Sequence, residues 1–128
     1  MQVLLDTHAL IWWLAGDDKL SGPARAVMAD ESNSILVSAA TSWEITTKVR
    51  IGKLPNVAPV AGELPIIIAQ HGFEELPVTF TDGAHAGLIP GPHRDPFDRM
   101  LIAQSQIRGV PPVSNETLFD DYGIRRIW

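Results

Sequence analysis

Four acidic residues, far apart in the chain, stand where carboxylates can do chemistry together. They are Asp6, Glu44, Asp98 and Glu116. Carboxylates that share one pocket cannot all stay ionised unless cations hold them, because each raises the pKa of its neighbours. The chain has no cysteine and no evident histidine cluster, so an all-oxygen ligand set favours Mg²⁺ or Mn²⁺ over zinc. Such ions can activate water for the hydrolysis of a phosphodiester.

Three of these acids also have a structural interpretation. Asp6 directly follows a predicted strand and suits the N-cap of the next helix. Glu44 completes a capping box that starts at Thr41, and it can pair with Lys48 one helical turn later. Glu116 fits a solvated acid in a first helical turn. Taken singly, none of these three acids identifies a site.

Asp98 is the acid that is hardest to explain by structure alone. It lies in the segment His93–Arg99, where Asp95 suits an N-cap because a proline follows it. Asp98 then leads the apolar stripe that contains Leu101 and Ile102, and no basic residue lies on that stripe. A carboxylate that is partly desolvated needs a partner. A metal ion would satisfy it.

The elements that must position these acids alternate along the chain. Short apolar runs predict strands at Val3–Leu5, Ile35–Val37, Phe73–Leu76 and Pro112–Ser114, with an edge strand at Ile124–Trp128. Helical patterns lie between them at His8–Ala15, Pro23–Asp30, Ser42–Ile51, Pro65–His71, Asp82–Leu88 and Phe97–Arg108. This alternation predicts an α/β fold with a parallel sheet and helices on both faces. Acids that follow parallel strands are expected to converge at the carboxyl edge of the sheet.

Length and composition predict one domain over residues 1–128, since no internal repeat or linker is found. Hydrophobic residues make up 45% and charged residues 20% of the chain, which argues against disorder. The first residues lack the pattern of a signal peptide, and no apolar run approaches the roughly 20 residues of a membrane helix. We therefore expect a cytoplasmic protein without a membrane partner. The net charge of -5 argues mildly against a nucleic-acid partner, because phosphate-binding proteins usually carry a basic face.

Several segments resemble the motifs of the PIN-domain nucleases. Leu4–Ala9 and Ser38–Ile45 are similar to the first two motifs of that family. Glu44–Leu54 and Arg94–Gln104 resemble the branch of VapC-type toxins, as does the closing segment Tyr122–Trp128. Any one of these motifs is weak. The ordered set is specific, and it spans essentially the whole chain.

The resemblance implies a three-layer α/β/α sandwich with a central parallel sheet that cuts RNA with Mg²⁺ or Mn²⁺. Asp6 matches the first invariant acid of the family, Glu44 the second and Asp98 the third. Asp95 resembles an additional acid of the VapC branch, or serves only as the helix cap. The fourth family motif is usually Thr-Asn-Asp, whereas this chain has Ser-Asn-Glu at residues 114–116. The longer Glu side chain leaves direct metal ligation and a water-mediated contact as alternatives.

The resemblance further implies the toxin of a toxin–antitoxin pair, an endoribonuclease that forms homodimers. A small cognate antitoxin would insert a segment into the acidic groove. Thr7 is a candidate to orient the metal ligands or a bound water. Arg94 and Arg99 are candidates to bind RNA phosphates, because arginine offers a bidentate fork. Solvated loop charges are an equal alternative for these two arginines.

Three other functions stay open at this stage. A degenerate PIN domain would bind RNA or a protein partner without cleavage, and the Ser-Asn-Glu departure suits it. A phosphoryl-transfer enzyme with an aspartyl nucleophile would want a second Asp two residues after Asp6, where His8 stands. A receiver-like signalling module would want an acid pair at the first strand and a lysine after the last. Here the first strand ends in a lone acid and the fourth is followed by Ser114.

Overall fold

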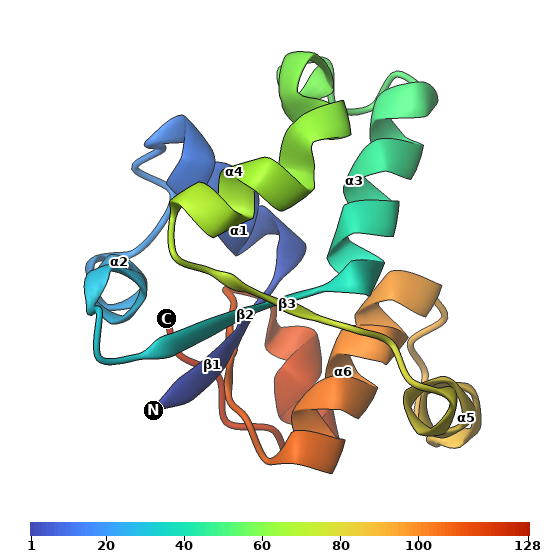
Figure 1. Cartoon of the computed structure of the whole chain (residues 1–128). Coiled ribbons are helices and arrows are strands. Elements are labelled where there is room, and N and C mark those ends of the chain that lie inside the picture. Colours follow the sequence, from blue (N-terminus) through green and yellow to red (C-terminus); the bar gives the residue numbers. More distant parts are fainter.

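A parallel sheet of four strands forms the centre of the structure, a computed structural model that describes residues 1–128 (Figure 1). Its strands are β1 (Gln2–Leu5), β2 (Ser34–Ser38), β3 (Glu74–Leu76) and β4 (Pro112–Val113). They lie in the order β3-β2-β1-β4, and every neighbouring pair is parallel. All four carboxyl ends therefore meet at one edge of the sheet, as the alternation of strands and helices predicts.

Helices cover both faces of this sheet (Figure 1). One face carries α1 (Thr7–Ala15), α2 (Gly22–Ala29), α3 (Ala39–Arg50) and α4 (Leu64–Gln70). The other face carries α5 (Phe80–Leu88) and α6 (Pro96–Arg108). Two 3₁₀ helices, η1 (Ala58–Glu63) and η2 (Thr117–Tyr122), have no counterpart among the elements predicted from the sequence. The arrangement has the three predicted layers.

Strands β1, β2 and β4 bury both of their faces, which explains their apolar sequences, whereas β3 lies at the edge of the sheet and exposes Glu74 and Glu75. Successive side chains of a strand point to opposite faces, and Val3 and Leu5 pack into one core while Leu4 packs into the other. The larger core contains 14 buried residues beneath α1–α4, and the smaller one contains 7 beneath α6 and η2. Two buried cores fix the sheet, and with it the edge where the strands end.

Helix α3 begins three residues earlier than the sequence predicts. Ser38 is its N-cap, because the Ser38 hydroxyl accepts a hydrogen bond from the Ala40 amide at 3.0 Å. The predicted capping box from Thr41 to Glu44 is therefore wrong. Both residues lie inside the helix and are buried, so a local cap does not explain why an acid stands at position 44.

The closing segment does not form the predicted edge strand at Ile124–Trp128. It makes one isolated bridge, between Ile127 and Val113. The Ile127 amide donates to the Pro112 carbonyl, and the Ser114 amide donates to the Ile127 carbonyl. Because β4 has only two residues, it offers no longer ladder for the closing segment to join.

No helix in the structure combines the length and the apolar character that crossing a membrane requires.

Candidate active site

The four predicted acids come together at the carboxyl edge of the sheet. Asp6 follows β1 directly, Glu44 lies in α3 just after β2, and Asp98 lies in the first turn of α6. Glu116 lies three residues beyond the end of β4. Asp6 and Glu44 are each only 5% exposed, whereas Asp98 and Glu116 are half-buried. Helices α3 and α6 begin beside each other at this edge, which brings the second and third acids together (Figure 1).

Asp6 is held by groups that follow two neighbouring strands, β1 and β4. Its Oδ1 accepts a hydrogen bond from the Thr7 amide at 2.7 Å, so it is the N-cap of α1, as the structural interpretation predicts. Its Oδ2 accepts a hydrogen bond from the Ser114 hydroxyl at 2.6 Å. Burial raises the pKa of Asp6, while the hydrogen bonds from Ser114 and Thr7 act in the opposite direction. Asp6 is therefore both a cap and a fixed, buried carboxylate of the site.

Glu44 is held by one hydroxyl and one ammonium group. The Thr7 hydroxyl donates to Glu44 Oε1 at 2.7 Å. Lys48 forms the predicted ion pair with Glu44 Oε2 one turn along α3. Thr7 is itself buried, and it links the first acid to the second because its amide donates to Asp6. These contacts are what an orienting role for Thr7 requires.

Asp98 differs from these two acids because no protein group donates a hydrogen bond to its carboxylate. Its backbone amide donates to Asp95 Oδ1 at 3.0 Å, which confirms Asp95 as the N-cap of α6. Burial and the negative charges of Asp95, Asp6, Glu44 and Glu116 raise the pKa of Asp98 to about 7. Carboxylates repel this strongly only when they lie close to one another, so these acids converge around Asp98.

The carboxylate oxygens of the site are chemically suited to bind a hard divalent cation. Carboxylate oxygens are the ligands that Mg²⁺ and Mn²⁺ prefer, and a cation beside Asp98 would remove the repulsion that raises its pKa. The side chains do not already form a finished site, since no group of three or more is arranged to hold a metal. Glu44 has both of its oxygens engaged by Thr7 and Lys48. The Lys48 ammonium already neutralises Glu44, whereas Asp6 accepts only from neutral donors and Asp98 accepts from none, so Asp6 and Asp98 are the better candidates for direct ligation.

Ser114 is a residue of the site whose role the sequence analysis did not identify. It lies directly after β4, and its hydroxyl donates to Asp6 and accepts from the Glu116 amide at 2.9 Å. The signal lies in the register of the sheet. Leu5 of β1 pairs with Val113 of β4, so the residues that follow them, Asp6 and Ser114, are neighbours.

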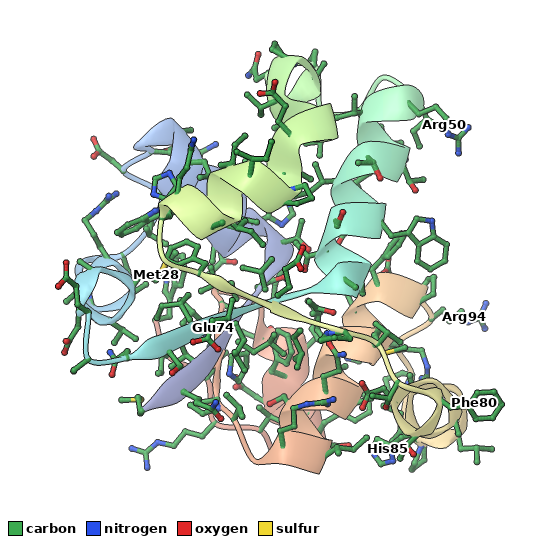
Figure 2. All side chains as sticks on the ribbon, viewed as in Figure 1. Met28, Arg50, Glu74, Phe80, His85 and Arg94 are labelled. Carbon is green, nitrogen blue, oxygen red and sulfur yellow. The ribbon has the colours of Figure 1, made fainter.

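The two arginines expected to bind phosphate have different environments. Arg99 donates to the carbonyls of Ala86 at 2.9 Å and of His93 at 2.8 Å, and also to the carbonyls of Gly87 and Ile89. It therefore fixes the segment between α5 and α6, and these contacts explain Arg99 without a phosphate, so a phosphate contact for Arg99 stays a prediction. Arg94 is exposed and points outward from that segment (Figure 2). The Arg94 guanidinium makes no hydrogen bond within the chain, and phosphate binding by Arg94 stays a prediction.

Comparison with known proteins gives consistent results. A family model described as the PIN domain matches residues 3–124. Ribonuclease VapC16 of Mycobacterium tuberculosis is 43% identical over 61 residues, a match that takes in 48% of this chain and 43% of that protein.

Solved structures share the fold at low sequence identity. VapC20 of Mycobacterium tuberculosis, a sarcin–ricin loop cleaving toxin, has a TM-score of 0.64 and 18% identity, with 96% of each chain covered. VapBC2 of Rickettsia felis, bound to a DNA fragment from the promoter, has a TM-score of 0.62 and 16% identity over 94% of this chain and 92% of that one. A toxin–antitoxin complex of Klebsiella pneumoniae has a TM-score of 0.55 and 16% identity, and covers 90% and 87% of the two chains. These similarities confirm the predicted three-layer α/β/α architecture.

Proposed function

The chain belongs to the PIN-domain family, and from this premise we propose that it is a metal-dependent endoribonuclease that hydrolyses RNA phosphodiesters. The observation that carries the proposal is the Asp98 carboxylate, which has no hydrogen-bond donor and whose pKa is raised to about 7 by burial and by four neighbouring acids. Such an arrangement costs folding stability unless a cation joins it. The name of the related ribonuclease VapC16 supports RNA as the substrate.

The residues of the site divide the work between holding a cation and orienting the reactants. Asp6 and Asp98 would hold Mg²⁺ or Mn²⁺, with Glu116 and Asp95 as further acids within reach of the site. When bound, such an ion lowers the pKa of a water molecule and stabilises charge on phosphate oxygens. Glu44, fixed by Thr7, would orient the attacking water. Hydrolysis by this route needs no covalent intermediate on the protein.

A toxin–antitoxin role is the physiological part of the proposal. The similarity to VapBC2 of Rickettsia felis and to the Klebsiella pneumoniae toxin–antitoxin complex supports it. The partner would be a small cognate antitoxin that inserts an arginine or lysine into the acidic groove, where it would neutralise the unpaired Asp98. A homodimer is the proposed form of the toxin.

A degenerate domain that binds RNA or a protein without cleavage is the second candidate. The observation that favours it is the ion pair between Lys48 and Glu44, because an acid already neutralised by lysine adds little to the attraction for a metal. The Glu at position 116, in place of the usual Asp, points the same way.

One experiment separates the two candidates. The purified chain is incubated with single-stranded RNA in Mg²⁺ or Mn²⁺, with and without a chelator, beside the variant Asp98→Asn. Cleavage that needs the metal and is lost in the variant supports the nuclease. A Mn²⁺ titration by calorimetry accompanies it. Metal binding with no cleavage in either ion would favour the degenerate domain, and equal cleavage by parent and variant would overturn the assignment of Asp98.

A further inference from the structure

We infer that an apolar groove beside the acid site binds a base of the RNA strand, next to the phosphodiester that is cut. This inference rests on the proposed function and extends it to a subsite. The groove lies between the first turns of α3 and α6 and the side of α5, with a volume of about 500 Å³. The residues that define it are Trp43, Phe97, Arg94, Met100, Gly83 and Gly87.

The groove adjoins the acid site through the chain itself. Trp43 directly precedes Glu44 on α3, and Phe97 directly precedes Asp98 on α6. Each helix therefore directs its acid into the site, and the aromatic residue that precedes this acid lines the groove. A strand whose phosphate lies at the acids would have a neighbouring base within reach of these rings.

The ring of Trp43, supported by the half-buried Phe97, forms a platform that the protein itself leaves uncovered. The ring centroids of Trp43 and Phe97 are 4.8 Å apart at an interplanar angle of 73°, an edge-to-face contact that fixes both side chains. Trp43 is nevertheless 61% exposed. Bases of single-stranded nucleic acids stack on exposed aromatic side chains with little regard to sequence. The platform therefore suits a base of any kind.

The opposite side of the groove is kept flat by two glycines of α5. Gly83 and Gly87 are one helical turn apart, and both line the groove. Glycine inside a helix is unfavourable relative to alanine, and neither position needs it for packing, since a Cβ built there meets no atom within 4 Å. A side chain at either position would enter the open groove. The glycines thus preserve a space that the fold itself does not use.

Arg94 adds a positive charge at the rim of the groove. It forms no ion pair or hydrogen bond within the chain, and it is exposed (Figure 2). The segment that carries it is fixed by Arg99 through the His93 and Ile89 carbonyls. An unpaired guanidinium on a fixed segment, beside an aromatic platform, fits a strand with a phosphate on each side of a base. A protein side chain in the groove would need no such charge.

The test measures the affinity for RNA in the full chain with the variant Asp98→Asn as the parent, so that the strand is not cut. The probe is a fluorescein-labelled single-stranded RNA octamer of mixed sequence, followed by anisotropy. Trp43→Ala is expected to weaken binding roughly tenfold, the size of effect seen when one stacking side chain is removed. Trp43→Phe keeps an aromatic ring and should stay within about threefold of the parent.

A second variant fills the groove without removing any contact. Gly83→Leu raises helix propensity and should fold at least as stably as the parent, yet it should also weaken binding roughly tenfold. Phe80→Ala is the matched control, because Phe80 is 98% exposed on the same helix but lies outside the groove (Figure 2). It should bind as the parent does. An octamer of abasic residues, with the same charges, should bind all of these variants equally.

The outcomes are distinct. Parent-like affinity in both Trp43→Ala and Gly83→Leu would overturn the base subsite. A loss of affinity that appears only together with a shift from dimer to monomer in sedimentation would overturn it too, and would assign the groove to contact between copies. If the subsite fails while metal-dependent cleavage persists, the proposed function stands. If base-dependent binding persists without cleavage in any metal, the nuclease fails and the subsite stands.

Discussion

Two aspartates on neighbouring helices of the same face show opposite ways of placing a carboxylate away from water. Asp82 in α5 is fully buried, and it accepts hydrogen bonds from Arg108 at 2.9 and 3.0 Å, from the Thr79 amide at 3.0 Å and from Gln104 at 3.0 Å. Asp98 in α6 is half-buried and accepts none. The more deeply buried group is the better satisfied one.

The pKa of Asp82 is lowered and the pKa of Asp98 is raised, which agrees with the difference in their hydrogen bonds. Burial acts to raise the pKa of Asp82, but the hydrogen bonds from Arg108, Thr79 and Gln104 outweigh it and hold that pKa well below its usual range. At Asp98, burial and like charges act together and raise the pKa to about 7. Hydrogen-bond and ion-pair partners, rather than the depth of burial, decide whether a buried acid stabilises the fold. An acid kept at a cost to stability is the better candidate for a functional role.

The largest expected effect is on cleavage, from Asp98→Asn. Removing this carboxylate takes away a proposed metal ligand, and we expect cleavage to fall by roughly a hundredfold or more, the size typical of lost transition-state stabilisation. The thermal midpoint in chelator should stay the same or rise, because the amide relieves repulsion among the acids. Initial cleavage rates and thermal melts test the two parts. An unchanged rate would remove Asp98 from catalysis.

The converse variant, Asp82→Asn, should damage folding and leave the chemistry intact. Removing one partner of a buried ion pair leaves Arg108 without its carboxylate, and we expect a loss of about 3 kcal/mol in unfolding free energy. Asp120→Asn is the control, because its ion pair with Arg126 lies at the surface and should cost less than about 1 kcal/mol. Urea unfolding measures both variants. Cleavage per folded molecule should match the parent, and equal losses in the two variants would contradict the comparison.

The sequence predicts the acid site better than it predicts the Asp82 cluster, for a physical reason. In a parallel sheet every strand ends at the same edge, so Asp6, Glu44 and Glu116, which come after β1, β2 and β4, converge through the order of the elements. Asp98 follows α5 rather than a strand, and it joins them because α6 begins beside α3. The partners of Asp82 depend instead on how α5 packs against α6. Arg108 and Gln104 lie 26 and 22 residues away, and no local pattern links them to Asp82.

The same distinction explains the contacts that the sequence does not predict. Arg99 lies within the segment that carries Asp98, so a phosphate contact was a reasonable expectation. Its actual partners are carbonyls before α6, whose placement depends on the chain reversal between Ile89 and His93. The N-cap of α3 is Ser38 and not the predicted Thr41, because β2 continues directly into the helix. Order along the chain is predictable, while contacts made by packing are not.

As the pH changes, the two aspartates should change the folding stability of the metal-free protein in opposite directions. The raised pKa of Asp98 means that the folded state binds its proton more tightly than the unfolded state does. Its contribution to stability is therefore present below about pH 4 and is lost as the pH rises through about 7. The lowered pKa of Asp82 means that its contribution is present above about pH 4 and is lost on further acidification.

Urea unfolding in chelator from pH 3 to pH 8 tests the direction in which each aspartate changes the stability. Stability should pass through a maximum, and the decline between pH 4 and pH 7 attributable to Asp98 should be about 1–2 kcal/mol after allowance for its partial exposure. Asp98→Asn should flatten the limb above pH 4, and Asp82→Asn the limb below it. Parallel curves for parent and variants would show that neither carboxylate has the assigned pKa direction.

The smallest effects are expected at two buried serines. Like the two aspartates, one serves the fold and the other serves the site, but their hydroxyl groups carry no charge. Ser105 donates to the Val110 carbonyl at 2.6 Å within the fold, and Ser114 donates to Asp6 at 2.6 Å within the site. Ser105→Ala removes one hydrogen bond and should lower the unfolding free energy by about 1 kcal/mol. Ser114→Ala removes two, because the hydroxyl also accepts from the Glu116 amide, and should cost about 2 kcal/mol. Only Ser114→Ala should also lower the cleavage rate, by several-fold, because it releases the Asp6 carboxylate. A matching loss of activity in Ser105→Ala would mean that stability, and not the position of Asp6, limits the rate.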